Sequence, residues 1–362
     1  MRIQRLLPPL IAIACTATTV RATTHFVPGS FPTIGQALSI AAPGDTVLVS
    51  PGTYSELLNL VDGVILRGAD SFDRPILDGA GAGPLLTGSN CGPNTAIESF
   101  VFRNALAIGE GGALRLVSCS IAVENCAFED NRATHGGAIG SEESDFTVTN
   151  CTFLGNTATQ TGGAIAATGM PSPAIVGCRF ENNGALAGGA ISVRNANDPV
   201  IQSSAFAFNA ADQGGALWFD LLTGGAVQGC TFVSNEAATS NGAAMFFNAL
   251  NAAVVTECIL SFGSGGGAVR VVTGATPTFG CNDAFGNTGG DSLAGGIDLG
   301  TNFSADPLFC DQALGDYRLA PGSPCLPDPP CGLVGAFAGC SVTSAGASIE
   351  SLTWSTIKAR YR

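Results

Sequence analysis

Ionisable side chains gather most densely between residues 124 and 145. Histidines and carboxylates can act as general acids or bases. A lyase acting on an acidic polysaccharide needs an Arg or Lys base and a Ca²⁺ site of clustered carboxylates. The candidate catalytic residues are Glu129, Asp130, Arg132 and His135. The same cluster also contains Glu124, Glu142, Glu143 and Asp145.

A second candidate site lies in three short apolar segments further along the chain. Alternation of side chains predicts that Trp218, Met245 and Phe247 face outward, and these aromatic and thioether groups could form a platform for a sugar ring. Charged groups flank them and could bond to sugar hydroxyls. The candidate ligand-binding residues are therefore Trp218, Met245, Phe247, Arg194, Asp220 and Arg270. The alternative is that the C-terminal cap or tail covers this apolar patch.

Both candidate sites lie within a region that repeats about every 26 residues, so the structure formed by this repeat must position their side chains. Each unit pairs a Phe-x-x-Asn motif, as at Phe128 and Asn131, with a Gly-Gly motif, as at Gly136-Gly137. One such unit cannot bury its own apolar face, so successive units must stack as the coils of a solenoid. We expect the phenylalanines to stack in a column and the asparagines to form an amide ladder, while the paired glycines allow a tight corner.

The repeat alignment weighs against catalysis by the first cluster. An enzyme must place ionisable groups on adjacent coils facing one way, but the aligned positions one unit later are Leu154, Gly155 and Thr161. Glu129 aligns with a second carboxylate, Glu181, only two coils away, at about 10 Å. We therefore expect a solvated polar edge, with His135 a turn residue.

The cysteines fall into two groups. Cys126, Cys151, Cys178, Cys230 and Cys258 follow the repeat, and at a coil spacing of about 4.8 Å they could form disulfides or a ladder of buried thiols. No close Cys-x-x-Cys pairs support a zinc site. The second group predicts the disulfides of a C-terminal cap, with Cys281–Cys310 the expected pair. Its members are Cys281, Cys310, Cys325, Cys331 and Cys340.

Composition and segment order give the expected domain organisation. Residues 1–22 read as a secretory signal peptide, with lipidation at Cys15 as the alternative. Residues 23–302 are expected to form the solenoid, opened by a capping helix near residues 36–42, and residues 303–340 the disulfide-rich cap. Residues 341–362 read as a linker and a basic amphipathic tail, either a sorting signal or an end cap. The net charge of −13, with Lys358 the only lysine, excludes a nucleic-acid partner, and no apolar run after the signal is long enough for a transmembrane helix.

The Phe-x-x-Asn and Gly-Gly-Ala-Ile motifs resemble the repeats of the chlamydial polymorphic outer membrane proteins. The opening segment, from Thr33-Ile34 through Pro43-Gly44-Asp45 to Thr53-Tyr54, resembles the first coils of pectin-lyase-like right-handed parallel β-helices. The resemblance implies an all-β right-handed parallel β-helix of about ten coils. Members of the first family are surface adhesins, which implies secretion or a place at the bacterial outer membrane.

Two functions follow from these observations. The first is a non-enzymatic, adhesin-like scaffold without a cofactor, whose partner is a polysaccharide or cell-surface glycan, with surface proteins as further partners. The alternative is a polysaccharide-acting enzyme of the pectin-lyase-like group, a Ca²⁺-dependent lyase. The Gly-His-Gly signature of polygalacturonases and the Gly-Gln-Asp-Thr signature of pectin esterases are absent from the sequence.

Overall fold

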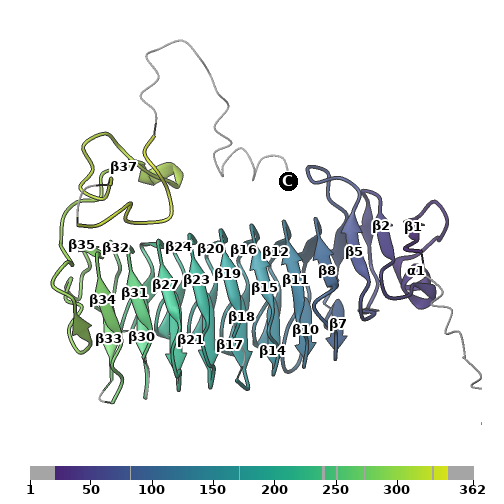
Figure 1. Ribbon diagram of the computed structural model, residues 1–362, viewed down its shortest axis with the longest axis horizontal. Coiled ribbons are helices and arrows are strands. Elements are labelled where there is room, and N and C mark those ends of the chain that lie inside the picture. Colours follow the sequence, from purple (N-terminus) through teal and green to yellow (C-terminus); the bar gives the residue numbers. More distant parts are fainter. Residues whose placement is uncertain are drawn as a thin grey trace, which may run out of the picture.

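The computed structural model describes residues 21–81, 83–170, 172–238, 241–249, 252–272, 274–327 and 330–340. Within these ranges the chain forms a parallel β-solenoid, which confirms the predicted fold class. Figure 1 shows the coils stacked along the long axis of the molecule, with the helix α1 (Ile34–Ile40) at the N-terminal end. The predicted signal peptide and the tail at 341–362 lie outside the described residues, apart from Arg21 and Ala22.

Each regular coil passes through four sheets in the order A, B, D and C. Within the described residues, sheet A has twelve strands and sheet B has ten, all parallel. Sheet A contains β1 (Thr24–Val27), β2 (Thr46–Val49), β5 (Ile65–Gly68), β8 (Thr95–Glu98), β11 (Ile121–Glu124), β15 (Thr147–Thr149), β19 (Ala174–Val176), β23 (Val200–Gln202), β27 (Ala226–Gln228), β31 (Val254–Thr256), β34 (Thr278–Gly280) and β36 (Ile297–Asp298). Sheet B contains β3 (Thr53–Tyr54), β6 (Ile76–Asp78), β9 (Val101–Arg103), β12 (Ala127–Glu129), β16 (Thr152–Leu154), β20 (Arg179–Glu181), β24 (Ala205–Ala207), β28 (Thr231–Val233), β32 (Ile259–Ser261) and β35 (Asp283–Phe285).

Sheets C and D meet at the Gly-Gly corner. Sheet C contains β4 (Leu58–Asn59), β7 (Leu86–Ser89), β10 (Leu114–Val117), β14 (Ile139–Glu142), β18 (Ile165–Thr168), β22 (Ile191–Arg194), β26 (Leu217–Asp220), β30 (Met245–Phe247) and β33 (Val269–Val271). Sheet D contains β13 (Arg132–His135), β17 (Thr157–Thr161), β21 (Gly184–Ala187), β25 (Ala210–Gln213) and β29 (Glu236–Ala237). At the corner, a Cβ on Gly137 would lie 2.2 Å from the carbonyl oxygen of Gly163, so only glycine lets adjacent coils approach this closely.

The interior confirms the predicted phenylalanine column. The rings of Phe102, Phe128, Phe153, Phe180, Phe206 and Phe232 stack in sequence with centroids 4.6–5.0 Å apart. All are buried in the core. Phe232 pairs in register with Leu260 of the next coil, so the column ends there.

The predicted amide ladder is also confirmed. Asn131, Asn156, Asn183, Asn209 and Asn235 are buried, and each Nδ2 of the first four donates to the Oδ1 of the next at 2.9–3.0 Å. Each Nδ2 also donates to a phenylalanine carbonyl of the preceding coil, as Asn183 does to Phe153 at 3.0 Å. After Asn235 the position is occupied by Gly263, which has no side-chain amide, and the ladder is interrupted there. It resumes at Asn287, whose Oδ1 accepts from the backbone N–H of Gly263 at 2.9 Å.

The periodic cysteines are buried free thiols, which decides between the two alternatives left open by the sequence. Their Sγ atoms donate to carbonyls two residues earlier, as Cys126 does to Glu124 at 3.3 Å. Burial raises the pKa of the Cys151 thiol well above its usual range. A thiol held in its protonated form is a poor nucleophile, so these cysteines act as small core residues.

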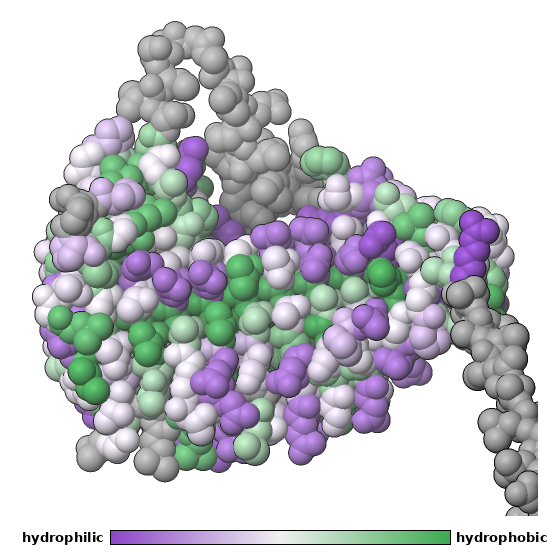
Figure 2. Space-filling view, in the orientation of Figure 1, coloured by the Kyte–Doolittle hydropathy of each residue, from purple (hydrophilic) through white to green (hydrophobic). Residues whose placement is uncertain are grey.

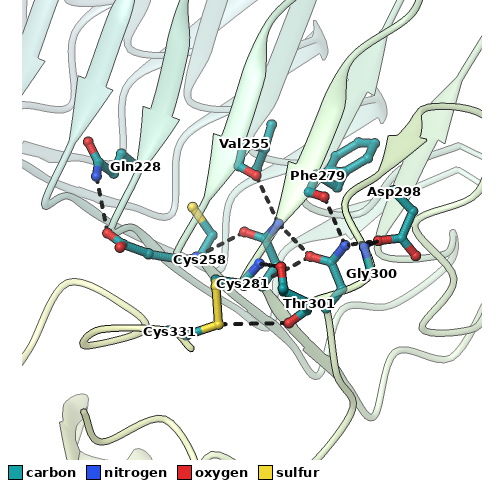
Figure 3. The surroundings of a disulfide bond; sticks show 12 residues. Gln228, Val255, Cys258, Phe279, Cys281, Asp298, Gly300, Thr301 and Cys331 are labelled. Carbon is teal, nitrogen blue, oxygen red and sulfur yellow. Dashed lines mark hydrogen bonds between the residues drawn. A yellow bond between two sulfur atoms is a disulfide. The ribbon is translucent and has the colours of Figure 1, made fainter. Parts of the chain in front are cut away.

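The C-terminal cap is held by two disulfides, Cys281–Cys331 and Cys310–Cys340. The predicted Cys281–Cys310 pair is therefore wrong, and Cys325, grouped with the disulfide cysteines, is a free buried thiol. Cys281 leads into the last paired strand of sheet B, β35, so its disulfide ties this coil to the cap (Figure 3). The cap itself contains β37 (Phe309–Asp311), a 3₁₀ turn (Gln312–Leu314) and β38 (Asp316–Leu319).

The cap packs on the outer face of sheet B. Tyr317 packs with Ala207 and Val233, and Val334 packs with Ile259. The backbone amide of Ala336 donates to the Thr231 hydroxyl at 2.8 Å. Figure 1 shows the segment around β37 beside the strands of the late coils. The residues contacted here belong to β24, β28 and β32 of sheet B.

A buried acid lies at the seam between the last coils and the cap. Asp283 accepts the amide of Ala305 at 2.9 Å and the thiol of Cys325 at 3.2 Å. Burial is the main cause that raises its pKa from 3.8 to about 6. The folded state therefore binds a proton more tightly than the unfolded state, and this group's contribution to stability is lost as the pH rises through about 6.

Asp283→Asn is accordingly expected to stabilise the protein at about pH 7.5, by about 1 to 3 kcal/mol, and to flatten the pH dependence of Tm between about pH 4 and 7. An asparagine keeps an oxygen for the Ala305 amide without a buried charge. Thermal unfolding across this pH range measures the effect, with the exposed Asp212→Asn as the control. If Tm of Asp283→Asn changed with pH as steeply as Tm of the unmodified protein, Asp283 would not be the source of this pH dependence.

Candidate functional site

The outer face of sheet C places two columns of side chains along the solenoid. Pairing in register gives the first column as Arg115, Gly140, Ala166, Ser192, Trp218, Phe246 and Arg270. The second column runs through Val117, Glu142, Thr168, Arg194 and Asp220. Small residues therefore occupy the middle coils and large ones the later coils.

The prediction that Met245 and Phe247 face outward is wrong. Met245 pairs with Leu217 and Phe247 with Phe219, and both are fully buried in the core. The outward residue of this strand is Phe246. The coil before it is longer than the motif alignment assumed, so that Gly242 occupies the place of the first glycine, Gly214. A register error of one residue moves every side chain of a strand to the opposite face.

The angle between sheets C and D holds a groove of about 400 Å³. It extends from the coil of β10 to the coil of β26, four coil steps or about 19 Å. One aromatic side chain lines it, together with hydroxyl, amide and charged groups. The lining residues are Glu110, His135, Thr161, Thr168, Gly169, Ser192, Arg194, Asn195 and Trp218.

Trp218 closes one end of this groove and offers little open surface. Its side chain is mostly covered, with the residue only 9% exposed. The indole N–H donates to Oε1 of Gln213 at 3.2 Å, which fixes the ring against the corner of its own coil. Trp218 is thus an aromatic wall of the groove and differs from the open platform that the sequence suggested.

Arg194 and Asp220 form an ion pair at the same end. The Nε atom of Arg194 lies 3.2 Å from Oδ2 of Asp220, and Asn248 donates to the other carboxylate oxygen at 3.0 Å. The Arg194 side chain is 60% exposed, whereas that of Asp220 is 9% exposed. Arg270, the remaining predicted residue, is exposed on β33 and does not line the groove.

The opposite end of the groove carries Glu110 and His135 on adjacent coils. The two residues form a parallel β-bridge, and Nδ1 of His135 lies 2.9 Å from the Thr161 hydroxyl one coil further on. Glu110 was not among the predicted site residues. It could have been found, because Glu110, His135 and Thr161 each directly precede a Gly-Gly pair.

The other members of the predicted catalytic cluster lie elsewhere. Glu129 belongs to sheet B, where burial and the neighbouring Asp130 raise its pKa. Asp130 sits at the following bend with φ 52°, and Arg132 is exposed at the start of β13. The structure thus brings only His135 of the four into the groove, beside Arg194 and Trp218 of the second predicted site.

The surface around the solenoid is otherwise mixed. Figure 2 shows a hydrophobic band along the face in view, bordered by hydrophilic side chains. Nowhere in the described ranges do three or more His, Cys, Asp or Glu side chains gather as a metal site requires. The helices of the described part of the chain are too short or too polar to span a bilayer.

Comparison with known proteins identifies a family match and distant structural neighbours. Residues 90–296 match the family described as "Right handed beta helix region". A crystal structure of the pectate lyase Pel9A is similar over 88% of this chain and 96% of that chain, with 13% identity and a TM-score of 0.48. A PL6 alginate lyase in complex with a trisaccharide is similar over 77% of this chain and 62% of that chain, with 12% identity and a TM-score of 0.39. No curated protein sequence matches the chain.

Proposed function

Because the chain belongs to the right-handed β-helix family, we propose that the groove along sheet C serves as a binding site and that the protein is a polysaccharide-binding scaffold. The observation that carries the proposal is the groove of about 400 Å³, in which hydroxyl, amide and charged groups converge beside one aromatic wall. This combination suits a sugar, whose ring edges need polar partners and whose faces pack on an aromatic side chain. A groove along the solenoid axis suits an extended chain of sugars.

The setting of this scaffold is part of the proposal. The signal-like sequence at residues 1–22 and the two disulfides of the cap both fit an oxidising, extracellular environment. We propose that the protein is secreted or held at the cell surface, where it acts as an adhesin-like module towards polysaccharides or cell-surface glycans. Surface proteins are further candidate partners.

Blocking the groove tests this proposal. Thr168→Trp is expected to weaken retention on the bound polysaccharide at least about tenfold, or ~1.4 kcal/mol, because the indole would fill the groove. Retention of the mature protein is measured on a panel of acidic, neutral and amino polysaccharides, with and without Ca²⁺. Thr168 is a better choice than Trp218, whose replacement would also remove buried packing.

Thr149→Trp is the matched control. Thr149 is also half-buried and outward, belongs to the same coil, and lies on sheet A away from the groove. It is expected to retain the polysaccharide as the unmodified protein does. Equal losses in both variants would show that the groove is not the binding site, and no retention on any polysaccharide would overturn the proposed function.

A second candidate function is that of a polysaccharide-acting enzyme. The observation that favours it is the placement of Glu110 and His135 on adjacent coils at one end of the groove, where they could exchange protons with a bound chain. The groove supplies only one carboxylate among its lining residues, whereas Ca²⁺ takes about six to eight oxygen ligands, so these residues do not fit a Ca²⁺ site. New chain ends scored in the retention assay, and lost in His135→Gln, would establish this second function.

A further inference from the structure

The charges of the groove restrict the class of sugar that it can bind, an inference that rests on the proposed function. Two residues among those lining the groove have charged side chains of opposite sign, Arg194 and Glu110. Their surroundings differ. Arg194 is paired with Asp220, whereas Glu110 forms no ion pair among the described residues.

Arg194 forms an ion pair with Asp220. Its Nε lies 3.2 Å from an Asp220 carboxylate that is almost fully covered by protein. A sugar carboxylate that drew Arg194 away would leave Asp220 with Asn248 as its remaining side-chain partner, and stranding a buried charge is costly. Asp220 also offsets the positive charge of Arg194, so Arg194 attracts a uronate less than an unpaired arginine would.

Glu110 has no such partner within the described residues. Its side chain is half-buried, and its Oε2 atom is completely buried without a hydrogen bond. The nearest ring, that of His135, directs Nδ1 to Thr161 and forms no ion pair with Glu110 in the described chain. A partly desolvated carboxylate without a cation is unfavourable, so a ligand cation beside it would be strongly favoured.

The other charges on this face are of both signs, with an excess of carboxylates. Glu143 lies at the edge of the groove and packs against Gly169, since a Cβ there would lie 2.9 Å from Glu143 Cγ. Arg115 is a half-buried cation on the neighbouring β10. With a net charge of −13, the whole chain also repels polyanions.

We propose that the groove selects a polysaccharide with free amino groups, a polymer of unacetylated hexosamine, and places an ammonium group beside Glu110. The sugar chain then extends over Thr161 and Ser192 towards Trp218. Neutral sugars lack the ion pair with Glu110, and polyuronates meet an acidic groove whose arginine is occupied.

Three oligosaccharide probes of equal length test the proposal. These are glucosamine oligomers, N-acetylglucosamine oligomers with the same backbone and no charge, and galacturonate oligomers. Binding is measured by calorimetry at about pH 6, where an ordinary carboxylate is ionised and most of an amine is protonated. We expect the glucosamine oligomer to bind at least about tenfold more tightly than its acetylated counterpart.

Glu110→Gln should abolish this preference, because it keeps the shape of the side chain and removes its charge. Glu142→Gln is the matched control: it changes the net charge equally on the same face, outside the groove lining, and should keep the preference. Melting curves of both variants verify folding. If Glu110→Gln does not fold, raising the salt concentration must weaken glucosamine binding to the unmodified protein and leave binding of the acetylated oligomer unchanged.

The outcomes separate this inference from the proposed function. Binding of the acetylated or uronate oligomers as tightly as the glucosamine oligomer would overturn the amino-sugar preference and leave polysaccharide binding intact. A preference that survives Glu110→Gln would also overturn the inference. Failure of all oligosaccharides and all polysaccharides to bind would overturn both.

Discussion

Asn183→Ala is expected to lower the free energy of unfolding by about 4 kcal/mol or more, the largest effect of any single substitution considered for this protein. The Asn183 amide makes four hydrogen bonds in the core. Its Nδ2 donates to Phe153 O and Asn209 Oδ1, and its Oδ1 accepts from the backbone and side-chain nitrogens of Asn156. Alanine leaves all four partners short of a hydrogen bond in a buried site, at about 1 to 3 kcal/mol for each group left unsatisfied.

Urea unfolding followed by circular dichroism measures this loss. Asn182→Ala is the matched control, because the neighbouring asparagine is exposed and its side chain makes one long contact of 3.4 Å with Glu181. Asn182 has φ 55°, so alanine there should cost about 1 kcal/mol through backbone strain alone. Similar losses for the two substitutions would show that the buried amide ladder contributes little.

Phe180→Ala is expected to have the second largest effect, about 3 to 5 kcal/mol. Its ring is fully buried and lies between Phe153 at 4.6 Å and Phe206 at 4.8 Å, nearly parallel to both. Alanine removes this burial, leaves a cavity and breaks the column in its middle. Phe180→Leu should cost less, because most of the volume is kept and the ring contacts alone are lost.

Thermal and urea unfolding of the same variants measure the effect. Phe208→Ala is the control, since Phe208 lies at the bend between Phe206 and Asn209 of the next coil and is 45% exposed. It should change the stability by less than about 1 kcal/mol. If Phe180→Ala were no more destabilising than Phe208→Ala, the column would not be a major source of stability.

The architecture could be predicted because the repeat encodes it many times over. Phe-x-x-Asn recurs in consecutive coils, so Phe153 and Asn156 can be aligned with their neighbours without knowledge of any long-range contact. The stacked rings and the amide ladder follow from that alignment, and both are found in the structure. Regular coils translate sequence period directly into spatial neighbours.

The site was harder to predict, because it depends on single positions. The coil before Gly242 breaks the regular spacing, and this misplaced Met245 and Phe247 on the outer face. Glu110 was overlooked because it precedes the first regular Phe-x-x-Asn unit, yet the corner of its coil brings it next to His135. The Gly-Gly pairs mark the corners, but the side chains that meet at each corner differ from coil to coil and are not part of the repeat.

The disulfide pairing and the position of the cap could not be predicted from the sequence, because both depend on contacts between distant segments. Five cysteines after residue 280 allow several pairings, and spacing alone does not choose among them. The choice depends on the cap resting on sheet B, where Tyr317 packs with Ala207 and Val233. No local sequence pattern predicts this contact, because the cap and the strands of sheet B that it contacts lie far apart in the chain.

Both interior columns are interrupted at the same coil, where Leu260 follows Phe232 and Gly263 follows Asn235. The amide ladder resumes one coil later at Asn287, whose Oδ1 accepts from Gly263 N and whose Nδ2 donates to Leu260 O. A solenoid is held by contacts between neighbouring coils, so we expect this coil step, which lacks both the ring stacking and the side-chain amide bond, to be less stable than the steps before it. The cap contacts the coils on both sides of this step. It forms a hydrogen bond to Thr231 of the coil before the step, packs on Ile259 of the coil after it, and is linked to the following coil by the disulfide of Cys281. The cap therefore reinforces this coil step from outside. Reducing its disulfides should destabilise the C-terminal coils, while the coils that carry the groove stay folded.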